Sequence, residues 1–137
     1  MNKILSATLL TFASCSTSAF AELCDQPKTQ SDIDYCAKYH FDAADGYLNS
    51  VYSRLKQNYV KYPAPKGALV AAQRAWVKFR DAECNQDKVA ADGGSETPVI
   101  LLDCKTHLTI ERTQQLENRL FCKEGNMACV TLGNAAD

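Results

Sequence analysis

The side chains best placed for chemistry fall into three polar sets, each at helical spacing. The first set lies in the run from position 72 to 84 and comprises Gln73, Trp76, Arg80 and Cys84. The second comprises Asp45, Asn49 and Tyr52, and the third Thr109 and Arg112. Residues three or four apart share one face of a helix. If the three faces meet, Arg80 and Arg112 can pair with Asp45. Asn49 can then hydrogen-bond Gln73.

Two interpretations of this network are open: a polar binding pocket, or a buried network that fixes how the helices align. We favour the second, because a charge buried in a helical core must be paired in any case. The network of Asp45, Asn49, Gln73, Arg80 and Arg112 is therefore predicted to be structural.

Catalytic chemistry is not indicated. The chain has two histidines, His40 and His107, which we expect at the surface, and it has no nucleophile elbow. Asp81 and Glu83 are too close along one helix to flank a glycosidic bond from opposite sides. Close Cys/His pairs of the zinc-binding kind are absent, as is a glycine-rich loop following a strand. We predict no catalytic residue, no metal, no cofactor and no enzymatic activity.

The N-terminus has the pattern of an export signal. A short basic start is followed by an apolar stretch and by the small-x-small triplet Ala19, Phe20 and Ala21. We expect a signal peptide of residues 1–21 and a mature domain of residues 22–137, located in the periplasm or secreted. Residues 12–15 also resemble a bacterial lipobox ending at Cys15. We favour soluble export over acylation there, because Phe12 stands where leucine is usual.

Removal of the signal peptide leaves six of the seven cysteines. An even number in an oxidising compartment favours three disulfides. If the second and third helices fold back on each other about residue 92, Cys84 and Cys104 lie within about one helical turn of each other. A short hinge before the first helix can bring Cys24 to Cys36. Among the possible pairings we favour the sequential one: Cys24–Cys36, Cys84–Cys104 and Cys122–Cys129.

Apolar residues at steps of three and four predict helices over about residues 31–62, 65–88 and 98–121. Ser31 with Asp34 resembles a capping box for the first, and Thr97 resembles an N-cap for the third. The second helix has the apolar stripe Leu69, Ala72, Trp76 and Phe79. Short connections make neighbours antiparallel, so the predicted fold is all-α: a small antiparallel three-helix bundle stapled by disulfides, with a disulfide-closed tail of residues 122–137.

Charge and hydropathy each exclude one class of protein. With 15 basic and 16 acidic residues the chain carries a formal charge of −1, without the concentrated basic surface of a nucleic-acid binder. It also has no apolar run long enough for a transmembrane segment. The charge is uneven, since residues 51–90 hold eight bases and three acids between two acidic segments. We interpret this as helices of complementary charge.

The combined pattern resembles the LprI-type lysozyme-inhibitor domain, a family of small exported bacterial proteins. Ala44, Asp45, Leu48, Asn49 and Tyr52 carry the first part of the resemblance, and Gln73, Arg74, Ala75, Trp76, Phe79, Arg80, Asp81 and Cys84 the second. Gly94, Ser95, Cys104, Thr109 and Arg112 complete it. The resemblance covers about residues 24–120 and implies a helical, disulfide-bearing envelope domain. The segment of Cys122 and Cys129 lies outside it.

Two functions remain open. One is an inhibitor that binds a lysozyme or a related peptidoglycan hydrolase by inserting a loop into its groove. The candidate loops are those of Lys61, Tyr62 and Lys66 and of Asp92, Ser95 and Glu96. The alternative is a structural or adaptor protein of the bacterial envelope without a hydrolase target. For both loops, a plain connection between helices is the competing interpretation.

We predict that the mature oxidised protein begins at Glu22 and weighs six hydrogens less than its reduced form, because six cysteines remain after export. Intact-mass analysis before and after reduction measures both values. A free thiol in the native protein would contradict three disulfides, and a diacylglycerol adduct on Cys15 would indicate the lipoprotein route.

Overall fold

The protein is described here by a computed structural model that defines residues 23–91 and 93–122. Three long helices make up most of this part: α2 (Gln30–Asn58), α3 (Pro63–Ala90) and α4 (Thr97–Leu120). No strand occurs within the described ranges, so the predicted all-α class is confirmed. The expected signal peptide, the lipobox and the tail beyond residue 122 lie outside them.

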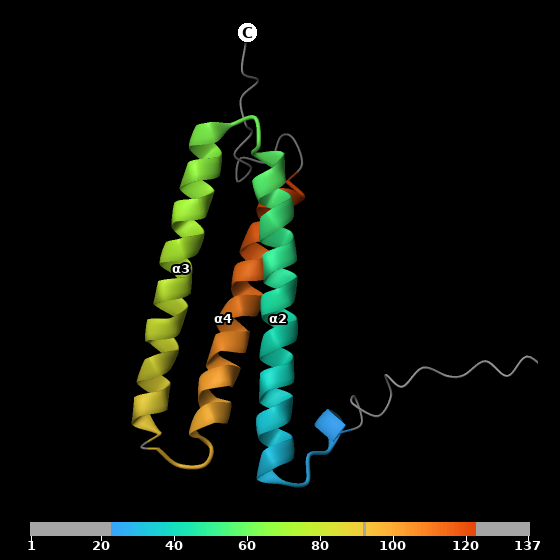
Figure 1. Cartoon of the computed structure of the whole chain (residues 1–137), viewed down its shortest axis with the longest axis vertical. Helices are drawn as coiled ribbons and strands as arrows, with labels where there is room; N and C mark the ends of the chain where they lie inside the picture. Colours follow the sequence, from blue (N-terminus) through green and yellow to red (C-terminus); the bar gives the residue numbers. More distant parts are fainter. Residues whose placement is uncertain (1–22, 92, 123–137) are drawn as a thin grey trace, which may run out of the picture.

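The three helices are not equivalent in their packing. α3 runs opposite to α2 and α4, which are parallel to each other (Figure 1). The closest backbone approach is between α2 and α4, α3 approaches α4 less extensively, and α2 and α3 approach each other at few points. α4 is therefore the central helix, and the arrangement is more open than a bundle with three equal interfaces.

The start of α2 differs from the expected capping box by two residues. The N-cap is Thr29, whose hydroxyl accepts a hydrogen bond from the Asp32 amide at 3.2 Å, while the Asp32 carboxylate accepts one from the Thr29 amide at 2.9 Å. The predicted box of Ser31 and Asp34 is thus wrong in register. Hydrogen bonds from Thr29 and Lys28 hold the pKa of Asp32 below its usual range.

The connections between helices also differ in detail from expectation. α2 ends at Asn58, four residues before the predicted end, and α3 begins directly at Pro63. Proline at the first position fits, because that amide has no intrahelical partner. The predicted N-cap Thr97 is instead the first residue of α4, after the N-cap Glu96. Gly93 has φ of 73°, a left-handed conformation that glycine adopts without strain and that turns the chain from α3 toward α4.

The hydrophobic core is small and belongs mainly to α2. Its fully buried members are Leu48, Val51 and Leu55 of α2, Leu69 of α3 and Leu116 of α4. Half-buried side chains pack around this cluster: Tyr52, Tyr59, Trp76 and Leu120. Because α3 gives one aliphatic side chain to the cluster, packing of aliphatic groups alone does not define its position.

The buried face of α3 is largely polar. Besides Leu69 it consists of Gln73, Arg80 and Cys84. The predicted apolar stripe is therefore partly wrong: Phe79 is 52% exposed and Ala72 is also exposed. The helix is rotated toward the face that brings Arg80 and Cys84 against α4, where both find partners.

Two disulfides lie within the described residues. Cys84 and Cys104 join α3 to α4, with Cα atoms 5.6 Å apart and the Cys84 side chain fully buried. Cys24 and Cys36 join the segment before α2 to its second turn, with Cα atoms 5.4 Å apart. These are the first two expected pairs. The third, Cys122 with Cys129, extends outside the described residues.

The rotation of α3 can be tested by truncating two of its aromatic side chains. Trp76→Ala is expected to lower the free energy of unfolding by about 3 kcal/mol, the low end for large aromatic side chains, because Trp76 is half-buried. Phe79→Ala should change it by less than about 0.5 kcal/mol, since Phe79 faces water. Urea unfolding of the oxidised proteins measures both. Equal losses would mean that the stripe through Phe79 is the buried one.

Candidate functional site

A buried guanidinium, that of Arg80, lies where the three helices meet. Its side chain is 9% exposed. One terminal nitrogen donates to Asp45 Oδ1 of α2 at 2.9 Å and to Thr109 Oγ1 of α4 at 3.3 Å. Its Nε donates to Asp81 Oδ1 at 3.2 Å on its own helix. One side chain of α3 thus contacts both other helices.

Aromatic rings cover the faces of this guanidinium. The carbon Cζ of Arg80 lies 5.2 Å from the ring centroid of Trp76 and 5.3 Å from that of Phe41. A planar cation over an aromatic face gains electrostatic attraction, and more so where water is excluded. Phe41 of α2, which was not among the predicted network residues, is therefore a further partner of the network.

The two carboxylates that pair with Arg80 are held by further donors. Asn49 donates to Asp45 Oδ2 at 2.9 Å, and Lys105 lies 3.1 Å from Asp81 Oδ1. Burial raises the pKa of Asp81, but Lys105 and Arg80 together outweigh it, so the pKa lies below its usual range. A carboxylate with a lowered pKa stabilises the fold at neutral pH, and this contribution is lost as the pH falls into the acid range.

Arg112 behaves differently from Arg80. Its Nε donates to Gln73 Oε1 at 3.1 Å and a terminal nitrogen donates to Gln115 Oε1 at 3.0 Å, and both acceptors are neutral. Within the described residues no carboxylate lies at ion-pair distance from it. Burial, with the charge of Arg119, lowers the pKa of Arg112. Its guanidinium carbon lies 5.9 Å from the ring centroid of Trp76.

The five residues of the expected network thus separate into two groups. Asp45, Asn49 and Arg80 meet in one, and Gln73 and Arg112 in the other. The anticipated pairs Arg112–Asp45 and Asn49–Gln73 are wrong. Gln73 lies about two helical turns from Arg80 on α3 and accepts from Arg112, while Asn49 donates to Asp45. Trp76 connects the groups by contacting both guanidinium groups.

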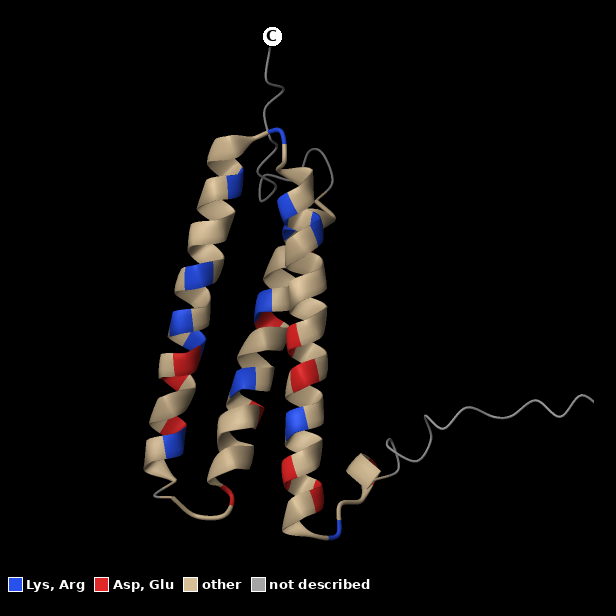
Figure 2. Cartoon of the chain, viewed as in Figure 1, with Lys and Arg blue, Asp and Glu red and all other residues tan. Residues whose placement is uncertain are grey.

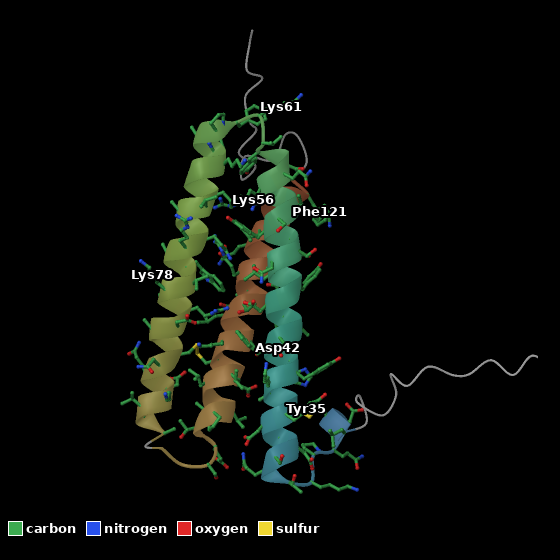
Figure 3. The ribbon with its side chains drawn as sticks, viewed as in Figure 1. Tyr35, Asp42, Lys56, Lys61, Lys78 and Phe121 are labelled. Atoms are coloured by element: carbon green, nitrogen blue, oxygen red, sulfur yellow. A yellow bond between two sulfur atoms is a disulfide. The ribbon has the colours of Figure 1, made fainter. Side chains whose placement is uncertain are left out.

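The two candidate loops lie at opposite ends of the molecule (Figure 1). In the α2–α3 turn, Lys61 is exposed at the end of the structure, as Figure 3 shows, while Tyr62 and Lys66 are half-buried. In the α3–α4 turn, Ser95 and Glu96 are exposed, and the Ser95 carbonyl accepts from Gln30 Nε2 at 3.4 Å. Asp92 lies outside the described residues.

Charge is divided between the same two ends. Figure 2 shows Lys and Arg spread along α2 and α3, whereas most Asp and Glu of these helices lie in the halves away from the α2–α3 turn. Residues 46–80 contain seven Lys or Arg and no Asp or Glu. The expected arrangement of one basic helix between two acidic ones is therefore not observed. Instead, the charge changes from basic to more acidic along the length of the molecule.

Other kinds of site are not supported within the described ranges. No group of three His, Cys, Asp or Glu side chains there is placed to hold a metal ion. None of the helices found there is both long and apolar enough to cross a membrane. His107 is 76% exposed and lies 3.3 Å from Glu111, and His40 is exposed as well.

These observations define a class of protein: a small helical domain with a disulfide between its last two helices and an ion pair between the buried Arg80 and Asp45. The family model described as lysozyme inhibitor LprI matches residues 24–116, and the chain belongs to this family. It is also 32% identical over 112 residues to an uncharacterized protein of Rhizobium meliloti (strain 1021), covering 74% of this chain and 81% of that protein. No solved structure matches significantly.

The different partners of the two buried arginines predict different mutational costs. Arg80→Ala leaves Asp45 without its cation and should cost about 2–4 kcal/mol of stability, somewhat less than for a fully buried pair because Asp45 is partly exposed. Arg112→Met leaves no carboxylate unpaired, although the buried Gln73 loses its donor, and should cost about 1–2 kcal/mol.

Chemical unfolding of both variants measures the difference, with the double variant as a check on independence. A larger loss for Arg112→Met than for Arg80→Ala would contradict this division of the network.

Proposed function

We propose that this protein is an exported inhibitor of a lysozyme-like peptidoglycan hydrolase, and that the α2–α3 turn enters the hydrolase groove. The observation that carries the proposal is the match to the lysozyme-inhibitor family over residues 24–116. Export through a signal peptide of residues 1–21 and a periplasmic or secreted location belong to the same proposal. The two disulfides support them, since such bonds persist in oxidising compartments.

The position and charge of the α2–α3 turn support its role as the inserting loop. Hydrolases of this class cleave a glycosidic bond with two carboxyl groups in a groove. Lys61 projects from the end of the molecule, and Lys66 follows on the first turn of α3. A cation entering a carboxylate-lined groove gains attraction where water is displaced.

The polar network has a supporting role in this proposal. Arg80 is buried and its partners Asp45, Asp81 and Thr109 all lie on the helices. The network therefore holds α2 and α3 in place and the turn between them in a defined position. A preorganised loop loses less conformational entropy when it binds.

The opposite turn would fit a different target. The α3–α4 turn carries Glu96 and lies at the acidic end of the molecule, so it would approach a strongly cationic lysozyme surface more favourably than the basic end. The two turns therefore predict opposite dependence on the charge of the hydrolase.

The double substitution Lys61→Glu and Lys66→Glu tests the inserting turn. It should weaken inhibition in a peptidoglycan lysis assay about tenfold, and more at low salt, where charges are screened least. The melting temperature should hardly change. Lys61 is exposed, and the half-buried Lys66 forms no ion pair within the described residues; such charges contribute about 0–1 kcal/mol.

The matched control carries the same charge change away from the turn, as Lys38→Glu with Lys88→Glu, and should inhibit like the wild type. Full inhibition by the first double variant would transfer the site to the α3–α4 turn. Absence of inhibition by the wild type across hydrolase types would leave the alternative, a structural or adaptor role in the envelope.

A further inference from the structure

A groove lies between α2 and α3 on the basic half of the molecule. It has a volume of about 430 Å³ and is lined by Tyr52 of α2 and by Gln73, Arg74, Val77 and Lys78 of α3. That volume falls within the range of about 300–1,000 Å³ that is typical of small-molecule sites. The groove exists because α2 and α3 approach each other closely at few points, while both pack against α4.

The lining combines apolar surface with cations. The ring of Tyr52 and the side chain of Val77 form the apolar part, and Val77 is 36% exposed although it is aliphatic. Arg74 and Lys78 line the groove on the α3 side, and in Figure 3 the Lys78 side chain extends away from α2. On the α2 side the ammonium of Lys56 lies 5.3 Å from the Tyr52 ring centroid.

No acidic residue compensates these cations on either wall. Both walls belong to residues 46–80, which contain no Asp or Glu. The acids of the neighbouring half of α4 are engaged elsewhere, with Glu111 beside His107 and Glu117 accepting a hydrogen bond from Tyr47. Asp45 and Asp81, which bound the acid-free segment, both pair with Arg80.

A buried positive charge lies behind the groove. Gln73, which lines it, accepts a hydrogen bond from Arg112, and that guanidinium has no carboxylate partner among the described residues. A charge in this low-dielectric position is screened less than one in water, so it adds to the positive potential at the groove.

We propose that this groove binds a small amphipathic carboxylate, with its acyl or aryl body against Tyr52 and Val77 and its carboxylate among Lys56 and Arg74. The apolar lining alone would accept a neutral ligand, and the cations alone would accept any anion. Their combination selects a molecule with both features. The site is separate from the exposed α2–α3 turn and needs no hydrolase, so it stands or falls independently of the inhibitor role.

Octanoate, below its micellar concentration, is a suitable probe of the full oxidised protein. Calorimetry should show binding at one site, and amide chemical shifts should change at Tyr52, Gln73 and Val77. Octanol has the same chain without charge and octylammonium reverses the charge, so both should bind at least about tenfold more weakly.

The matched variants are Arg74→Glu and Lys88→Glu, which make the same kind of charge change at exposed positions of α3. Arg74→Glu should weaken octanoate binding about tenfold while its melting temperature stays near that of the wild type, and Lys88→Glu should bind normally.

The proposal would be overturned if octanol or octylammonium bound as tightly as octanoate, or if folded Arg74→Glu bound octanoate as the wild type does. Chemical-shift changes confined to helices other than α2 and α3 would overturn it as well. Binding to anionic phospholipid vesicles without affinity for octanoate would also overturn it, in favour of a membrane surface as the partner of this face.

Discussion

The ion pair between the buried Arg80 and the partly exposed Asp45 is the interaction on which the position of α3 depends. α3 contributes one leucine to the aliphatic core, so hydrophobic packing would allow it to rotate or slide. The hydrogen bonds from Arg80 to Asp45 and Thr109 are directional, and a rotated helix would leave a desolvated guanidinium unpaired. The Cys84–Cys104 bridge lies one turn further along the same face and fixes the same alignment covalently. A polar cluster and a disulfide together do here what a larger core does elsewhere.

The general fold could be predicted from the sequence, but the orientation of α3 could not. Periodicity, Pro63 and Gly93 mark three helices, because backbone preferences act locally. The sequence left open which face of α3 is buried, since Phe79 and Arg80 are adjacent and each lies on a stripe of residues with the helical period of 3.6. Apolar periodicity favoured Phe79, whereas in the structure the partners available on α2 and α4 bury Arg80. The network residues were recognised by type and spacing. Which of them pair depends on how far the three helices are shifted along their axes relative to one another. The sequence of one helix does not contain this information, which is why Arg112 was assigned the wrong partner.

Charge gives the molecule two dissimilar ends, and this bears on any partner. The α2–α3 turn and the neighbouring groove belong to residues 46–80, which carry basic side chains and no acids, whereas the α3–α4 end carries most of the acids of α2 and α3 together with some bases (Figure 2). A chain with a formal charge of −1 can thus present a positive surface to one partner and a negative surface to another. The net charge alone would have suggested that the protein has neither a strongly positive nor a strongly negative surface.

The disulfide between α3 and α4 has a consequence for how the protein responds to proteolysis. It encloses the exposed α3–α4 turn in a covalent loop closed by two cysteines 20 positions apart. A protease that cuts this turn, at Ser95 or Glu96 for example, opens the chain but leaves both helices attached, with the Arg80 network and the core on either side of the break intact. Proteolysis at this exposed connection would then yield a two-chain molecule that retains its architecture, much as in proteins that mature by nicking. The α2–α3 turn has no such bridge across it within the described residues, so a cut beside Lys61 would separate α2 from the disulfide-linked pair in all but noncovalent contacts.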